Sequence, residues 1–239
     1  MSQIHKYSEL VYGKKLDKAT IEEFLDVDYR KATQRWVKSR YKDFSIYDKP
    51  LYLSTLITSY FHLSNGSTRN AIAYLKKLYP DRWEKLKVFD DYNGLGLTTR
   101  DLVKAGFNKA WFYNSCQLQR DLFRKITLDD GFPDRKFVED ADRSGKYDVV
   151  LSFEVIEHYQ KPEEYLDTVL KMVKKDGLFI YSMGFRDMHT GHFPEYEIGG
   201  QMVSMRKAGR SIKTLLEDRG FENMNIKCWN GKPTFYRKK

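Results

Sequence analysis

The chain has 239 residues, 41% of them apolar, which is enough to bury one hydrophobic core, and a doubly wound α/β sheet of this size usually forms a single domain. Its two cysteines form no Cys-x-x-Cys pair and no Cys/His cluster, which excludes a structural zinc site and fits a reducing compartment. The net charge of +9 favours contact with a polyanion but does not bear on the fold.

No segment has the features of a membrane span or a secretion signal. The longest apolar stretch, residues 51–63, is interrupted by Ser, Thr and Tyr and is shorter than the roughly 20 residues that a membrane-spanning helix needs. Residues 1–15 alternate polar and charged side chains and lack the apolar run of a signal peptide. We therefore expect a soluble, cytoplasmic protein that does not interact with membranes.

The basic residues are concentrated in residues 1–85, which we expect to form a helical N-terminal extension packed on the core. This part holds sixteen Lys and Arg against ten Asp and Glu, so six of the nine net positive charges lie here. One predicted helical face carries basic residues at spacings of four, three and four, and the other side is apolar or aromatic. The basic face consists of Lys31, Arg35, Lys38 and Lys42, and the opposite side of Tyr29, Ala32 and Trp36. The basic face is either an ordinary solvated surface or a stripe that binds nucleic acid.

A second helix of the extension is predicted before the core begins. Asn65-Gly66 indicates a turn, Ser67 is suited to cap a helix, and the helix continues over residues 71–79 until Pro80 stops it. From residue 86 to residue 239, short apolar runs alternate with helix-length segments, which is typical of βαβ units and a parallel sheet. The predicted strands are residues 87–90, 110–114, 136–139, 147–152 and 178–182, and the predicted helices are residues 98–105, 117–126, 162–174 and 206–219.

Two features refine this prediction. Pro162 followed by two glutamates suits the first turn of a helix, which we expect to continue to Asp176-Gly177. Asn230-Gly231, between runs at residues 225–229 and 233–236, predicts a C-terminal hairpin. The expected fold is a doubly wound α/β domain with a mostly parallel seven-stranded sheet, an antiparallel C-terminal hairpin and the helical N-terminal extension.

The turn after the first predicted strand is typical of nucleotide-binding proteins. The strand ends at Asp90, and the following segment, residues 91–96, contains glycines that let the backbone approach a ligand. Asp90, Gly94 and Gly96 match the first motif of the class I S-adenosylmethionine-dependent methyltransferases, and Tyr92 stands where that motif has its first glycine. Over residues 86–239 the chain resembles this family.

Three further segments support the resemblance, whereas Asn114 departs from the family pattern. Asn114 ends the second strand, where the family carries an acidic residue that binds the cofactor ribose, and Asp140-Ala141 resembles the segment that meets the adenine. Residues 147–158 and 174–180 resemble the branch that includes ubiquinone-pathway O-methyltransferases. The resemblance implies S-adenosylmethionine as cofactor, bound by Asp90, Tyr92, Asn93, Gly94, Gly96, Asn114, Asp140, Ala141, Ser152, Phe153 and Glu154.

Few catalytic side chains are expected, because the methyl group of this cofactor sits on a reactive sulfonium and the protein mainly aligns the reactants. A base is needed only where the acceptor loses a proton. The candidates are His158, which either shapes the cofactor-binding helix or touches the acceptor, and His189 and His192 after the fifth strand. His189, His192 and Asp187 have side chains that can bind a metal ion. No further residues follow at the spacing of metal ligands, so no metal is expected.

The acceptor is the least constrained part of this prediction. The segment from Ser152 to Glu154 contains neither the Asn/Asp-Pro-Pro-aromatic motif nor the Pro-Cys nucleophile of DNA base methyltransferases. A dehydrogenase is disfavoured because Asn114 is not the acidic ribose partner that such enzymes use. The basic face favours a nucleic acid or nucleotide-like acceptor. Three alternatives stay open: a small-molecule or sugar O/N-methyltransferase, transfer of another part of the cofactor, and a degenerate fold that acts as a binding or regulatory subunit.

Overall fold

A computed structural model describes residues 17–43, 66–91, 96–113, 120, 124, 145–185, 191–228 and 232–239. The described helices are α2 (Lys18–Lys38), α4 (Ser67–Leu78), α5 (Leu97–Lys104), α7 (Pro162–Val169) and α8 (Met205–Asp218), with 3-10 helices at Trp83–Lys85, Ile156–His158 and Leu170–Met172. The strands are β1 (Lys87–Asp91), β2 (Lys109–Tyr113), β3 (Tyr147–Phe153), β4 (Val173–Ser182), β5 (Glu195–Ile198), β6 (Gln201–Ser204), β7 (Phe221–Asn223) and β8 (Thr234–Lys238).

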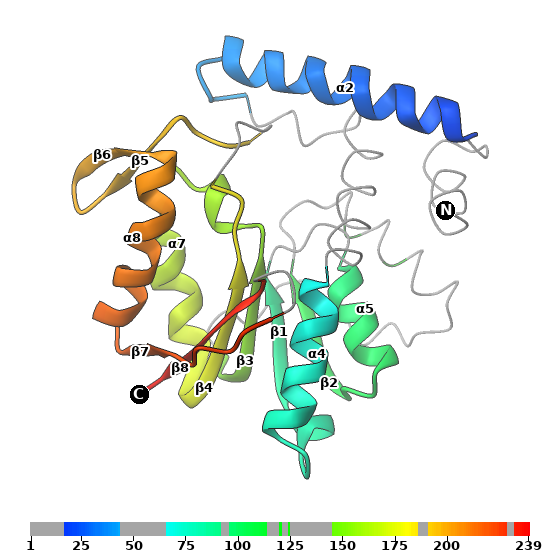
Figure 1. Cartoon of the computed structure of the whole chain (residues 1–239), viewed down its shortest axis with the longest axis vertical. Coiled ribbons are helices and arrows are strands. Elements are labelled where there is room, and N and C mark those ends of the chain that lie inside the picture. Colours follow the sequence, from blue (N-terminus) through cyan, green and yellow to red (C-terminus); the bar gives the residue numbers. More distant parts are fainter. Residues whose placement is uncertain are drawn as a thin grey trace.

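The central sheet has the order β2-β1-β3-β4-β8-β7 in the described residues (Figure 1). Strands β2, β1, β3 and β4 run parallel, and β8 pairs antiparallel with both β4 and β7. This confirms the predicted mostly parallel α/β sheet with an antiparallel C-terminal hairpin. The described sheet has six strands rather than the predicted seven. The predicted strand at residues 136–139 and most of the helix at residues 117–126 lie outside the described residues.

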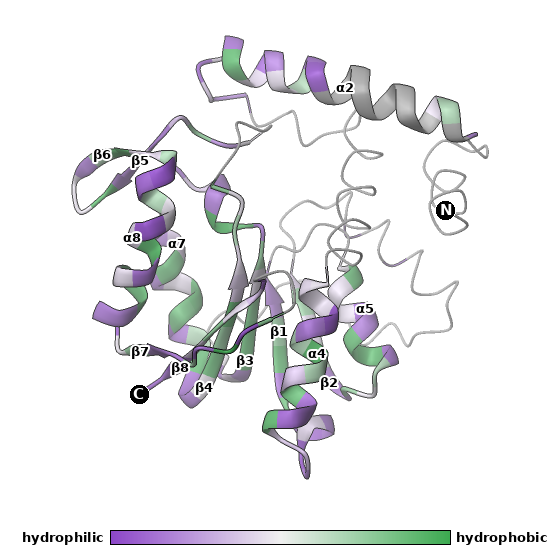
Figure 2. Ribbon diagram, in the orientation of Figure 1, coloured by the Kyte–Doolittle hydropathy of each residue, from purple (hydrophilic) through white to green (hydrophobic). Residues whose placement is uncertain are grey.

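Helices pack on both faces of the sheet. Neighbouring strand residues point to opposite sides, so each strand contributes apolar side chains to both helical layers. In β1, Val88 contributes to the apolar cluster formed with α4 and α5, whereas Phe89 contributes to the cluster formed with α7 and α8. Both side chains are fully buried. Figure 2 shows hydrophobic residues along β1 and β3, as expected for parallel strands that are covered on both sides.

Two predicted boundaries are wrong around β4. Helix α7 ends at Val169 and is followed by a 3-10 turn, so it stops before Lys174. Strand β4 begins at Val173, and its pairing with β3 shifts register where Tyr147 faces Val173 and Val149 faces Leu178. Asp176 lies in this irregular segment with φ of +61°. A residue in the left-handed region interrupts regular strand pairing. Residue types that suit such an interruption also suit the end of a helix, so Asp176-Gly177 resembles a helix stop in the sequence.

The C-terminal hairpin also uses an earlier strand than predicted. Its first strand is β7, Phe221–Asn223, and residues 225–228 of the run predicted as a strand form none. Asn225 adopts φ of +52°, which is unfavourable in a strand. Asn230-Gly231 lies outside the described residues, so the predicted turn itself stays a prediction.

A second hairpin, which the sequence prediction missed, joins β5 to β6. These strands pair antiparallel, with Ile198 opposite Gln201. Gly199 and Gly200 connect them with φ of +60° and +71°. Positive φ at both central residues is the geometry of a two-residue hairpin turn, and glycine adopts it without strain.

The basic N-terminal helix packs on the core through the side predicted from its pattern. Ala32 and Trp36 are buried in the cluster that contains Phe89, whereas Lys31, Arg35 and Lys38 are exposed. Lys42 is exposed too, but α2 ends at Lys38, so its predicted place on the same helical face is wrong. The backbone leaves the helix at Ser39, and Arg40 and Tyr41 adopt positive φ.

Other starts in this part are close to the prediction. Gly66 rather than Ser67 occupies the position before α4, and α4 reaches Leu78, with Tyr79 following it.

None of the helices that the structure describes combines the length and the apolar character required to cross a bilayer.

Replacing Trp36 by Ala should weaken the attachment of α2. The indole ring is fully buried and its N–H donates to the carbonyl oxygen of His192 at 2.6 Å, so truncation should lower the free energy of unfolding by about 3–5 kcal/mol. Val37→Ala is the matched control, because Val37 is 45% exposed and should change the same quantity by less than about 0.5 kcal/mol. Urea denaturation measures both, and equal effects of the two substitutions would contradict the packing described.

Candidate functional site

The polar side chains predicted to carry function gather where β1, β3 and β4 end. These strands are parallel, so their carboxyl ends meet at one edge of the sheet (Figure 1). Pairing places Asp90 beside Leu151 and Phe153 beside Ser182. In doubly wound sheets this edge is where ligands bind, so the register alone assembles a candidate site.

Asp90 organises the turn between β1 and α5. Its carboxylate is buried, and Oδ2 accepts hydrogen bonds from the backbone N–H of Thr99 at 3.1 Å and from the Thr99 hydroxyl at 2.8 Å. Gly96, with φ of +64°, immediately precedes α5. Asp90 therefore acts as a cap for the first turn of α5 and fixes the direction in which the positive end of that helix points.

The end of β3 is joined to α7 and to β4. The Ser152 and Tyr165 hydroxyls are hydrogen-bonded at 2.8 Å in the buried interior, and Phe153 is buried. Burial raises the pKa of Tyr165 well above its usual value, as does the nearby charge of Asp91, so this hydroxyl stays protonated. Ser152, near the end of β3, is thus held by a hydrogen bond between two neutral hydroxyl groups.

Glu154 leaves β3 in a strained backbone conformation. Its φ is +54°, in the left-handed region that non-glycine residues rarely adopt. Its N–H donates to the Ser182 carbonyl at 3.0 Å, and its Oε1 accepts from Nζ of Lys232 at 2.7 Å. The C-terminal segment before β8 thereby supplies a positive charge at the carboxyl end of β3.

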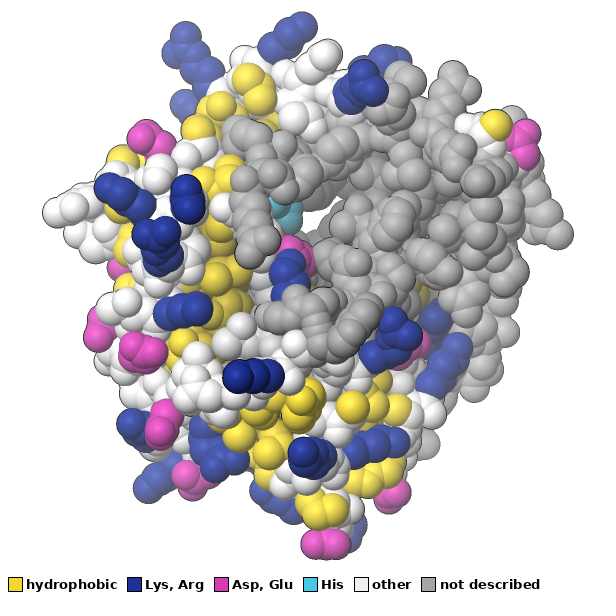
Figure 3. All heavy atoms as spheres, viewed as in Figure 1, with side chains coloured by type: hydrophobic (Ala, Val, Ile, Leu, Met, Phe, Trp, Pro, Cys, Tyr) yellow, Lys and Arg dark blue, Asp and Glu magenta, His cyan; other side chains and the backbone are white. Residues whose placement is uncertain are grey.

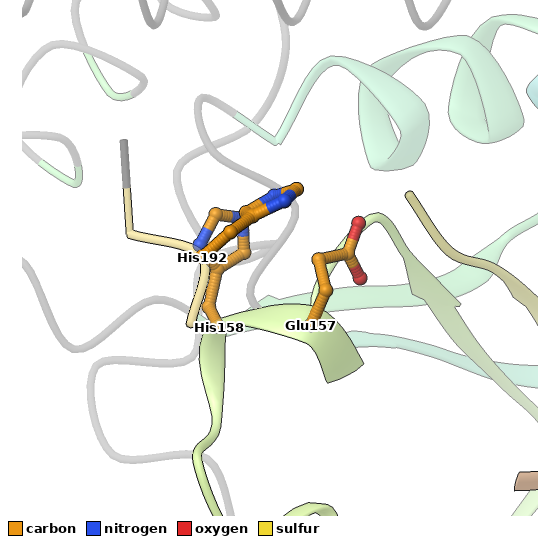
Figure 4. Close-up of side chains that lie close together, drawn as sticks. All are labelled: Glu157, His158 and His192. Atoms are coloured by element: carbon orange, nitrogen blue, oxygen red, sulfur yellow. The ribbon is translucent and has the colours of Figure 1, made fainter. Parts of the chain in front are cut away.

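Among the described residues, Glu157, His158 and His192 form the one group of three or more His, Cys, Asp or Glu side chains whose ligand-type atoms lie close together. Glu157 and His158 belong to the 3-10 helix Ile156–His158, and His192 follows the end of β4 (Figure 4). One ligand-type atom of each residue lies within 4.8 Å of those of the others. The two imidazole rings meet edge to face, with centroids 4.9 Å apart.

Glu157 supplies the carboxylate of this group and is buried, at 1% exposure. Its Oε1 accepts from the Gly184 N–H at 2.7 Å, whereas its Oε2 has no hydrogen-bond partner in the described part of the chain. Burial raises the pKa of Glu157 well above its usual value, and the negative charge of Glu154 raises it further, while the Gly184 N–H opposes the rise. A carboxylate in this position is stabilised by any added positive charge or donor.

Gly184 lets the two glutamates approach the backbone. A Cβ at this position would lie 2.8 Å from Oε2 of Glu154 and 3.0 Å from Oε1 of Glu157. A side chain at this position, just after β4, would therefore displace the Glu154 carboxylate from its present place.

Two long-range contacts hold the backbone of the cluster. The Tyr196 hydroxyl donates to the Glu157 carbonyl at 2.8 Å and accepts from the Phe193 N–H at 3.2 Å. Trp36 of α2 donates to the His192 carbonyl, and His192 itself is only 5% exposed. In the face that Figure 3 shows, a histidine side chain lies near acidic and basic side chains.

The structure brings together some of the predicted site residues and does not test others. His158, His192 and Glu154 lie in one region, and Asp90, Gly96, Ser152 and Phe153 lie at the same sheet edge. The other predicted residues lie outside the described part of the chain, namely Tyr92, Asn93, Gly94, Asn114, Asp140, Ala141 and His189. The prediction of site residues omitted Glu157, Gly184 and Lys232. The Glu-x-x-Glu-His pattern at residues 154–158 was the available signal for Glu157, whereas Lys232 has none in the local sequence.

Adding one methyl group at Gly184 should disrupt the cluster. Gly184→Ala should lower the free energy of unfolding by about 1–3 kcal/mol, because the new Cβ overlaps the Glu154 carboxylate. In a Glu154→Ala background the same substitution should cost clearly less, since the closest atom is gone. A double-mutant cycle followed by thermal unfolding measures this coupling, and additive effects would contradict the contact.

Comparison with known proteins gives a family for the chain. A family model described as a methyltransferase domain matches residues 94–226, more than half of the chain. It begins in the turn between β1 and α5 and includes the Glu157, His158 and His192 cluster. No curated protein matches the sequence.

Solved structures that are similar to this one are distant in sequence. Magnesium protoporphyrin IX methyltransferase from Synechocystis PCC 6803, with bound S-adenosylhomocysteine, is 14% identical, and the match covers 90% of this chain and 98% of that one with a TM-score of 0.55. An N-methyltransferase from Bradyrhizobium japonicum WM9, also bound to S-adenosylhomocysteine, is 10% identical, with coverage of 71% and 86% and a TM-score of 0.46. Given the extent of the family match, the chain belongs to the methyltransferase-domain family and is a class I enzyme that uses S-adenosylmethionine as its cofactor.

Proposed function

We propose that this methyltransferase acts on a hydroxyl oxygen of a nucleic acid or nucleotide-like acceptor. The observation that carries the proposal is the hydrogen bond from Trp36 to the His192 carbonyl. It joins the basic helix α2 directly to the loop that holds a histidine of the candidate acceptor site. The basic face of α2, which suits phosphates, is thereby joined to the loop of His192, which suits a hydroxyl.

The cofactor would lie at the turn that Asp90 organises. S-adenosylmethionine supplies an activated methyl group, and the residues of the chain need only bind it and orient the acceptor. The positive end of α5 and the left-handed Gly96 fit a ligand that approaches the backbone closely. Contacts from Tyr92, Asn93, Gly94, Asn114, Asp140 and Ala141 belong to this proposal, as do contacts from Ser152, Phe153 and Glu154.

The acceptor would lie beside β3 and β4, next to Glu157, His158 and His192. Methylation of a hydroxyl forms a bond between oxygen and the methyl carbon, breaks the carbon–sulfur bond and leaves its electron pair on sulfur. The hydroxyl proton must leave the oxygen in the same process. Imidazole and carboxylate groups are the side chains that can orient a hydroxyl and assist this loss, and the cluster offers both.

The exposed residues of α2 and the segment after it would position the acceptor. Lys31, Arg35, Lys38 and Lys42 are all exposed. Basic side chains bind phosphates without reading sequence, so they fix where a polymer lies rather than which base it presents. Specificity for the methylated hydroxyl would come from the buried cluster.

A small-molecule acceptor is the second candidate, and the burial of the cluster favours it. Glu157 and His192 are 1% and 5% exposed, as expected for a site that encloses its ligand. On this alternative the basic face of α2 is solvated surface with no part in substrate binding.

The two candidates differ in their response to charge reversal on α2. Changing Lys31, Arg35 and Lys38 to Glu should weaken binding of mixed-sequence oligonucleotides and reduce the slope of log affinity against log salt by about 2–3, since each phosphate contact contributes about 0.9. The matched control reverses the exposed Lys77, Lys85 and Lys109, which lie in α4, in the 3-10 helix before β1 and at the start of β2. Fluorescence anisotropy over a range of salt concentrations measures binding. Equal slopes for both triple variants and the unaltered protein would remove the nucleic-acid proposal.

Cofactor binding gives an independent expectation. S-adenosylhomocysteine should raise the melting temperature because it binds only the folded protein, by an amount that grows with its concentration, whereas NAD should not. Asp90→Asn should reduce this stabilisation, since a neutral amide caps α5 less well than a carboxylate. Differential scanning fluorimetry checks both, and the absence of any shift at millimolar cofactor would be evidence against this site.

A further inference from the structure

We infer that Glu157, His158 and His192 form a binding site for one divalent transition-metal ion. Each residue contributes one ligand atom, and all three atoms lie within 4.8 Å of one another. The side chains come from two segments, the 3-10 helix after β3 and the chain following β4, and they end close together (Figure 4).

The donor set specifies the class of ion. Two imidazole nitrogens and one carboxylate oxygen are the protein ligands of many catalytic zinc sites, which leave a fourth position for water or substrate. Zinc binds these atoms at about 2.0–2.2 Å, so its ligands lie about 3.5 Å apart in a tetrahedral site. Binding would draw the three atoms, which now lie within 4.8 Å of one another, together to about that spacing.

The unsatisfied oxygen of Glu157 is a separate observation that points to a ligand. Its Oε2 is buried and has no hydrogen-bond partner in the part of the chain that the structure describes. A buried acceptor left in this state costs about 1–3 kcal/mol, and more when it is charged. The ion pair formed by Lys232 is directed to Glu154 instead. A bound dication would supply the charge and the bond that Glu157 lacks.

The surrounding structure holds the proposed ligand residues in place through hydrogen bonds to their backbone and side chains. Gly184 fixes Oε1 of Glu157, Tyr196 fixes the Glu157 carbonyl, and Trp36 fixes the His192 carbonyl. Hydrogen bonds around ligating residues orient them and raise metal affinity. The packing of α2 and of the β5–β6 hairpin therefore fixes the backbone of the residues that would bind the metal.

The role of the ion rests on the proposed function. At the open position the metal would bind the acceptor hydroxyl oxygen and lower its pKa, so that the proton leaves to solvent as the oxygen attacks the methyl carbon. His158 and His192 would then act as ligands rather than as free bases. Methyl transfer would depend on the ion.

Direct metal binding tests the inference without any assay of activity. Tag-free protein is stripped with a chelator and titrated with Zn²⁺ by calorimetry, and with Co²⁺ while its visible absorption is recorded. We expect one ion per chain, with cobalt bands typical of four-coordination. His158→Ala, His192→Ala and Glu157→Gln should each weaken Zn²⁺ binding by at least about 100-fold, beyond the effect of losing an outer hydrogen bond.

Controls separate loss of ligands from loss of fold. Glu157→Gln retains an oxygen that can accept from Gly184, so it should remain folded while binding metal poorly. Glu164→Gln is the matched control, because the Glu164 side chain is 75% exposed on α7, and its affinity should equal that of the unaltered protein. Absence of saturable binding, or full binding by both histidine variants, would overturn the metal site.

Activity then separates this inference from the proposed function. Methylation of oligonucleotides that survives complete metal removal would overturn the role of the ion in methyl transfer and leave the proposed function standing. Stoichiometric metal binding without methylation of any nucleic acid would leave the site standing and contradict the proposed acceptor.

Discussion

Parallel pairing of β1, β3 and β4 is the constraint on which the site depends. Because the three strands run in one direction, Asp90, the segment from Ser152 to Glu154, and Gly184 end at one edge although they are distant in sequence. Reversal of one strand would carry its residues to the opposite edge. The sheet is stable in this arrangement because both faces are buried, with Val88 and Phe89 on opposite sides. The strand pairing that forms the core therefore also brings the residues of the site together.

Polar groups at this edge are arranged at some energetic cost. Glu154 adopts a left-handed backbone, and the buried Glu157 keeps one oxygen without a hydrogen bond in the described structure. Such features are unfavourable for folding and concentrate at functional sites. Gly184 accommodates both carboxylates, and Tyr196 and Trp36 compensate by fixing the surrounding backbone. The N-terminal helix thus serves the site through a buried contact as well as through its exposed charges.

The sequence predicts most of what is local and little of what is distant. Apolar runs located β1, β2 and β3, and the spacing around Trp36 correctly placed Ala32 and Trp36 on the buried side of a helix. The bond between Trp36 and His192 joins residues 156 positions apart, and that between Glu154 and Lys232 spans 78 positions. No local periodicity encodes such contacts. The same limit explains why His158 and His192 were identified as separate candidates, whereas their meeting with Glu157 required the fold.

The most direct test of this account is an experimental structure of the protein with S-adenosylhomocysteine bound. The account predicts that the adenosyl group lies at the turn between β1 and α5, and that the sulfur faces Glu157, His158 and His192 across a space for the methyl group and the acceptor. An acceptor atom in that space would lie about 3–3.5 Å from the methyl carbon, the separation needed for in-line transfer. A cofactor bound elsewhere, or one whose sulfur faces away from these three residues, would contradict it.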